Sequence, residues 1–202
     1  MTWEKQQQPV QTPPHYHHRP FWWVVGPFLF LLGMTVGAIL CGCIQEETLS
    51  HLDFLFQTDF KMRMEDPFAG AFISSTASSF LLMAFCYLSG MALWGILLLP
   101  AAPLLRGIGV GLIAGHLYAG YGMTGICFFL FGFLPGALIS SLGIFLAVQE
   151  SWNLGKKLLY QEKPVLYLGK YSVRFGLFMI PCLIGAAADW LSAVICSSFF
   201  SF

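Results

Sequence analysis

From Phe21 to Ile44 the sequence runs for 24 residues without a charged side chain. A helix needs about 20 mostly apolar residues to cross the roughly 30 Å hydrocarbon layer of a bilayer. About twenty polar residues precede this run, whereas a signal peptide has a shorter apolar core close to its cleavage site. The run therefore predicts a membrane-spanning helix that is retained as an anchor.

The composition extends this prediction to the whole chain. Hydrophobic residues make up 57% and charged residues 10% of the 202 residues, where a soluble chain has about 25% charged residues. So few charges could not cover a soluble surface of this size. The ten acidic and ten basic side chains cancel, so a nucleic-acid partner would meet no basic patch. A soluble enzyme, a DNA-binding protein and a disordered linker are excluded, and a membrane protein is indicated.

Further apolar stretches predict an all-α, polytopic membrane helical bundle with about five transmembrane helices. We expect a flexible cytoplasmic tail over 1–20 and a single membrane domain over 21–202. The expected spans are 21–44, 80–99, 107–119, 126–148 and 173–196, with a tight turn at Tyr121–Gly125. Leu49, Leu52, Phe56 and Phe60 recur at helical spacing after the first span, which predicts an additional interfacial amphipathic helix.

The basic residues predict the orientation of these spans. Cytoplasmic segments carry an excess of Lys and Arg, and an N-terminus inside the cell puts eight of the ten basic residues on that side. The loop 45–79 then lies outside, the basic loop 149–172 lies in the cytoplasm, and the C-terminus lies outside. The eight residues are Lys5, Arg19, Arg106, Lys156, Lys157, Lys163, Lys170 and Arg174.

Two of the charged residues that lie within or beside the expected spans are Arg106 and Asp189. Arg106 opens the third span, where we expect it at the inner interface with its head group reaching water or phosphate. Asp189 lies in the outer part of the fifth span beside Trp190, so a solvated carboxylate near the outer interface is favoured over a proton relay. Because the two are then at opposite faces, we expect no salt bridge between them.

Glycines at four-residue spacing mark several spans. Such spacing allows membrane helices to approach closely, and we expect packing within this chain, with a docking face for a partner's span as the alternative. Pro135 should kink the fourth span and free a backbone carbonyl. The pairs are Gly33 and Gly37, Gly111 and Gly115, and Gly132 and Gly136.

A search for catalytic patterns finds only fragments. Ser89-Gly90 is half of the glycine-flanked serine elbow of a rhomboid-type protease, and Glu46-Glu47 lacks the arginine that follows the paired glutamates of prenyl-type membrane endopeptidases. There is no HExxH and no phosphate-binding loop. We expect no enzyme activity, no cofactor and no metal site.

A short motif between the second and fourth spans is more specific. In Pro103-Leu104-Leu105-Arg106-Gly107-Ile108-Gly109-Val110-Gly111, a proline-containing turn is followed by the pattern K/R-G-x-x-x-G, in which Arg106, Gly107 and Gly111 match. This region resembles the stage II sporulation protein M family. Phe133-Leu134-Pro135-Gly136 resembles the family's Leu-Pro element, and Lys170-Tyr171-Ser172 fits the start of its last span. Wider relatives often carry a histidine after that proline and a glutamate further along; this chain has neither.

The resemblance implies a role in endospore formation. The family protein is a non-enzymatic scaffold in the septal and engulfing membrane, where it anchors peptidoglycan hydrolases, stage II sporulation proteins P and D, during septal thinning. The candidate partner loop of this chain is the acidic segment 45–66, with Glu46, Glu47, Asp53 and Asp59. Candidate structural or partner positions within the spans are Arg106, Gly107, Gly111, Gly115, Pro135, Gly136 and Asp189.

Two other functions stay open. A small permease, or a membrane subunit of a transporter, is favoured by the kinked glycine-rich spans, whereas the apparent lack of buried charge and of an internal repeat speaks against it. An intramembrane hydrolase is a weaker third possibility and would require His116 or Ser89 to be essential.

Overall fold

The computed structural model describes residues 21–42, 72–92, 94–160 and 165–199. These residues form helices and no strand, which confirms the predicted all-α bundle. The helices are α1 (Phe21–Cys41), α4 (Ser74–Met91), α5 (Gly95–Leu98), α6 (Ala101–Phe128), α7 (Leu134–Tyr160) and α8 (Val165–Phe199), with a π-helical segment, η2 (Phe129–Phe133), between α6 and α7. The expected amphipathic helix lies outside the described residues.

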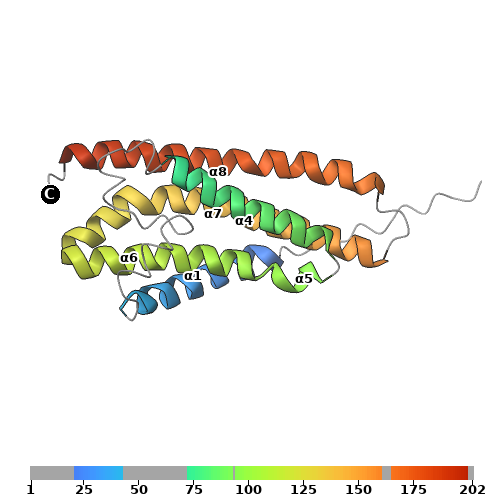
Figure 1. Cartoon of the computed structure of the whole chain (residues 1–202), viewed down its shortest axis with the longest axis horizontal. Helices are drawn as coiled ribbons and strands as arrows, with labels where there is room; N and C mark the ends of the chain where they lie inside the picture. Colours follow the sequence, from blue (N-terminus) through green and yellow to red (C-terminus); the bar gives the residue numbers. More distant parts are fainter. Residues whose placement is uncertain (1–20, 43–71, 93, 161–164, 200–202) are drawn as a thin grey trace, which may run out of the picture.

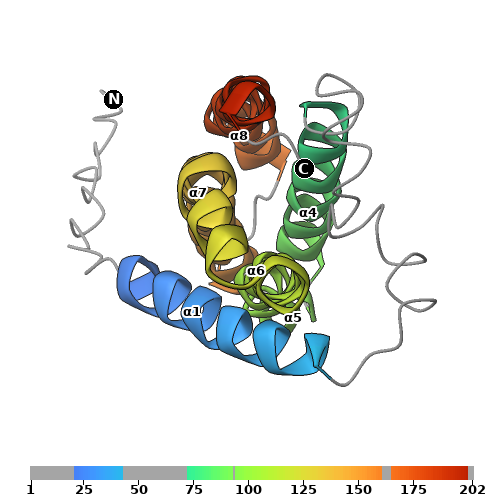
Figure 2. The same cartoon turned by 90° about the vertical axis from the view of Figure 1, so that its left-hand side faces the viewer.

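The long helices form an elongated bundle. α4, α6, α7 and α8 run along its length, and α4 and α7 run in the direction opposite to α6 and α8 (Figure 1). α1 packs on α6 and crosses it obliquely, as the end-on view in Figure 2 shows. The backbone hydrogen bonds of a helix lie within the helix itself, as a bilayer requires.

Within the described residues, three stretches are long and apolar enough to cross a membrane: Trp23–Cys41, Gly95–Lys156 and Gly169–Ser192. The middle stretch is folded back on itself at Gly122, whose φ is 60° and ψ is −132°. Only glycine adopts such a conformation readily. The turn expected at Tyr121–Gly125 is therefore present, and it reverses the chain within α6, ahead of the π-helical segment and α7.

Helix ends differ from those expected. α6 begins at Ala101 rather than near 107, because Pro103 lies in its first turn, where a missing N–H breaks no helical hydrogen bond. α4 begins at Ser74 rather than near 80. α7 continues to Tyr160, through the polar segment that follows residue 148.

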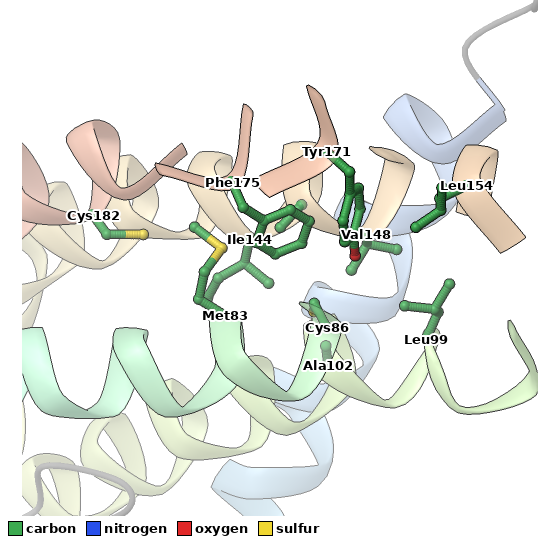
Figure 3. Packing of buried hydrophobic residues seen from close by; sticks show 11 residues of the cluster. Met83, Cys86, Leu99, Ala102, Ile144, Val148, Leu154, Tyr171, Phe175 and Cys182 are labelled. Atoms are coloured by element: carbon green, nitrogen blue, oxygen red, sulfur yellow. The ribbon is translucent and has the colours of Figure 1, made fainter. Parts of the chain in front are cut away.

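Buried side chains form two clusters along the bundle. One lies between α4, α7 and α8 and includes Met83, Cys86, Ile144, Tyr171 and Phe175 (Figure 3). The other joins α1, α6 and the start of α7 through Phe30, Val110, Ile113, Phe129, Phe133 and Ala137. The outer faces carry exposed apolar side chains such as Val24, Trp94 and Phe131. A surface of that kind suits a protein surrounded by lipid.

Candidate functional site

Arg106 is buried between three helices. Its side chain is 5% exposed. From α6, its Nη1 donates to Ser78 Oγ of α4 at 3.3 Å, and its Nη2 donates to Ser140 Oγ of α7 at 2.6 Å. The expectation that this arginine reaches out to water or phosphate is wrong, because two serines of neighbouring helices accept its hydrogen bonds inside the bundle.

The partners of Arg106 place it near the middle of the bundle. Ser140 precedes Ser151 by eleven residues on α7, and Ser151 bonds Tyr171 near one end of the bundle. In the other direction, Gly125 at the chain reversal lies fifteen residues before Ser140. At 1.5 Å per residue of α7, the level of Ser140 lies about 16 Å from that of Ser151.

Asp189 is also buried, against α7. It is 0% exposed, and a β-carbon added to Gly136 would overlap with its carboxylate. A solvated carboxylate near the outer interface was therefore the wrong expectation, although the neighbouring Trp190 is exposed. Gly136 has no side chain, and that absence provides the space that the carboxylate occupies.

The two opposite charges lie close to the same level of α7. Arg106 contacts Ser140, and Asp189 lies against Gly136, which is one helical turn away. The placement of these residues at opposite faces of the membrane was wrong. The error arose because the register between α7 and α8 depends on packing: Gly143 and Gly185 admit the close approach of the two helices, beside Cys182 and Ser140 respectively.

The glycines of α1 and α6 form a seam where these two helices cross. A β-carbon on Gly33 or Gly37 would overlap with the carbonyl oxygens of Leu104 or Ile108. Reciprocally, Gly107 and Gly111 face the carbonyls of Phe30 and Met34, and Gly115 faces Cys41 and Ala38. Backbones approach this closely only where both helices carry small residues. The structure thus uses these glycines for packing within the chain.

Pro135 lies in the first turn of α7 and is exposed. The distortion expected there appears immediately before it, as the π-helical segment Phe129–Phe133. The N–H of Leu134 bonds the carbonyl of Phe129, five residues earlier. A proline lacks the N–H that would continue an α-helical ladder, and a π-helical turn accommodates that loss.

A second polar cluster, which the sequence patterns did not reveal, joins α4, α7 and α8. Ser151 Oγ donates to the Cys86 carbonyl at 2.9 Å and lies 3.0 Å from the Tyr171 hydroxyl, which donates to the Tyr87 carbonyl at 3.2 Å. The rings of Tyr87 and Tyr171 stack with centroids 5.1 Å apart. The available signal was Lys170-Tyr171-Ser172, because Ser172 also takes part through its 2.9 Å bond to the Tyr87 hydroxyl.

A cavity of about 290 Å³ lies beside Arg106. Side chains of α4 and α6 and the ring of Phe133 line it, and all are apolar except Ser78 and Arg106. The buried arginine is thus at once a link between helices and part of a cavity wall.

The residues named for a hydrolase are not brought together. α4 and α6 run in opposite directions, and Ser78 and Arg106 mark a shared level. Ser89 lies eleven residues beyond Ser78, and His116 lies ten residues beyond Arg106, on the other side of that level. The two are therefore separated by about 30 Å along the bundle.

Other expectations fall partly or wholly outside the described residues. In the part of the chain that the structure describes, no three His, Cys, Asp or Glu side chains gather so that they could hold a metal ion. The candidate partner loop with Glu46, Glu47, Asp53 and Asp59 lies outside the described residues.

Comparison with known proteins supplies the family. The model of the family described as stage II sporulation protein M matches residues 27–188. That range covers α1 from Pro27 onward, the glycine seam, Arg106, the π-helical segment, the Tyr171 cluster and α8 as far as the residue before Asp189. No curated protein and no solved structure matches the chain. The chain therefore belongs to the stage II sporulation protein M family and is a sporulation-related membrane protein.

Proposed function

We propose that this protein is a non-enzymatic membrane scaffold that holds peptidoglycan hydrolases at the septum during septal thinning and engulfment. The partners are wall hydrolases equivalent to stage II sporulation proteins P and D. Its N-terminus lies in the cytoplasm, its C-terminus lies outside, and the acidic segment 45–66 meets the partners on the outer side.

The observation that carries this proposal is the family match over 27–188. The contacts that the buried polar side chains make between helices also support the proposal. Arg106 links α4, α6 and α7, and the Ser151–Tyr171 pair links α4, α7 and α8. Groups held in this way fix the geometry of the bundle, which is the property that an anchor for other proteins needs.

The proposal is tested by purifying the tagged protein from gently solubilised sporulating cells and identifying the bound proteins by mass spectrometry. The test variant changes Glu46→Gln, Glu47→Gln, Asp53→Asn and Asp59→Asn together. We expect hydrolases to copurify with the wild type and to fall at least tenfold with the variant, because the acidic surface would be neutralised while the spans stay unchanged.

A matched control changes Glu4→Gln and Glu162→Gln, two acidic residues on the proposed cytoplasmic side. Hydrolase recovery should stay at the wild-type level. If wild-type protein brings down no hydrolase, the scaffold proposal fails. Equal hydrolase recovery with both variants would show that the acidic segment is not the contact.

A second candidate function, a small permease or transporter subunit, gains from the structure. The sequence argument against it included a lack of buried charge, yet Arg106 and Asp189 are both buried, and Arg106 lines a cavity. Charges inside a membrane often mark solute paths. Recovery of an ATPase instead of a hydrolase in the same purification would favour this function.

A further inference from the structure

The cavity between α4 and α6 opens sideways. Leu81 and Leu105, which line it, are 44% and 38% exposed, so its mouth lies on the outer surface of the bundle. In a membrane that surface faces hydrocarbon. The cavity volume of about 290 Å³ is close to the lower end of ligand pockets, at about 300 Å³.

The apolar part of this cavity, along Leu81, Leu82 and Phe85, is not filled by water, because apolar cavities stay dry. Leaving it empty would forfeit the dispersion energy of its lining atoms. The material present at its mouth is the acyl chain of a lipid, which matches the side chains of Leu81, Leu82 and Phe85 along the α4 wall.

The deeper wall is polar and contains Arg106 and Ser78. Asp189 lies within about one helical turn of the level of Arg106 along α7, so a charge of each sign is already buried at this depth. A lipid head that brought a further charge to this depth would have to be desolvated at a large cost. An uncharged head with oxygen acceptors meets the guanidinium and the hydroxyl without that cost.

We propose that this cavity binds an uncharged acyl lipid whose ester or hydroxyl oxygens face Arg106 and Ser78. Its acyl chain lies along Leu81, Leu82 and Phe85 and leaves the bundle between Leu81 and Leu105. This binding site is independent of the scaffold function and would serve a scaffold or a transporter equally.

Photo-crosslinking of the full-length protein in lipid nanodiscs tests the proposal. Three probes carry the same diazirine-bearing chain: a monoacylglycerol, a fatty acid and an alkane without a head group. We expect the monoacylglycerol to label peptides containing 78–85 and 105–110, with at least tenfold less label from the alkane and less from the fatty acid. Excess unlabelled monoacylglycerol should abolish this labelling.

The test variant is Leu81→Trp, which fills the mouth from an exposed position, and the control is Leu88→Trp. Leu88 lies seven residues further along α4, close to the same helix face, and is exposed outside the cavity. Labelling should fall at least fivefold in the first variant and stay unchanged in the second.

Several results would overturn the proposal. Equal labelling by the alkane would remove the role of the head group, and stronger labelling by the fatty acid would show that the head is charged. Undiminished labelling in Leu81→Trp would place the lipid elsewhere. A cavity that takes no label from any probe would point to a protein side chain as its occupant.

Discussion

The Nη2 atom of Arg106 lies 2.6 Å from the hydroxyl of Ser140, which itself donates to the Ala137 carbonyl at 3.0 Å. This contact gives the basic residue of the motif K/R-G-x-x-x-G a structural role in this chain. Arg106 reaches from α6 to α4 and α7, while the adjacent Gly107, with Gly111, packs against α1. One six-residue pattern therefore fixes α6 against helices on two of its sides.

The first prediction concerns the removal of this charge. Arg106→Ala should destabilise the folded protein by roughly 3–5 kcal/mol, because it leaves the carboxylate of Asp189 buried without the compensating charge. Unfolding of the purified protein in mixed micelles, followed by circular dichroism, measures the difference.

The control for this change is Arg174→Ala. Arg174 forms an ion pair with Glu150, but its side chain is 56% exposed, and surface pairs contribute about 0–1 kcal/mol. The loss of folding stability should therefore be several times smaller than for Arg106→Ala. Equal losses in the two variants would contradict a structural role for the buried charge.

The second prediction compares two glycines of α6, for which we expect alanine to change the folding stability in opposite directions. Gly111→Ala should destabilise the bundle by about 1–3 kcal/mol, because the added methyl group overlaps with the Met34 carbonyl and forces α1 away. Gly120→Ala meets nothing within 4 Å, and alanine favours a helix over glycine by up to about 1 kcal/mol. The same micelle unfolding assay compares them, and a loss in both variants would contradict the α1–α6 seam.

The sequence predicted the helices better than it predicted how they pack against one another. The uncharged run from Phe21, the reversal at Gly122 and the glycine spacing each have a local physical cause, so the helices and the packing of glycines within the chain could be anticipated. The pairing of α1 with α6 could not. In a membrane each helix forms its own backbone hydrogen bonds, so these local patterns keep their meaning for each helix taken alone.

The buried charges could not be placed in the same way. Each was assigned a depth from its position in its own span, and Asp189 was assigned to the surface because Trp190 adjoins it. Their true environment depends on which residues of α7 face α6 and α8, and those are small residues such as Gly136 and Ser140. The presence of a small residue in the sequence does not indicate which side chain will pack against it.

The third prediction tests the placement of Asp189 by a double-mutant cycle. Gly136→Ala should be destabilising, because the methyl group takes the space of the carboxylate. An Asp189→Ala background removes the carboxylate and leaves the Gly185 carbonyl, 2.8 Å from the added carbon, as the remaining close contact. The same change should therefore be less costly by about 0.5–3 kcal/mol, the range observed for residues in contact. Additive losses in unfolding experiments would show that the two residues do not touch.

The fourth prediction compares the roles of two stacked tyrosines, Tyr87 and Tyr171. Tyr171 is 2% exposed, and its hydroxyl bonds the Tyr87 carbonyl and lies within bonding distance of Ser151. Tyr171→Phe should therefore destabilise the fold by about 1 kcal/mol or more, because it deprives a buried network of one hydroxyl. Tyr87→Phe keeps the stacked ring and removes only a surface bond to Ser172, so its loss should be less than half as large. If Tyr87→Phe were the more costly change in the micelle assay, the link from α4 to α8 would depend on Ser172 rather than on the buried Ser151–Tyr171 contact.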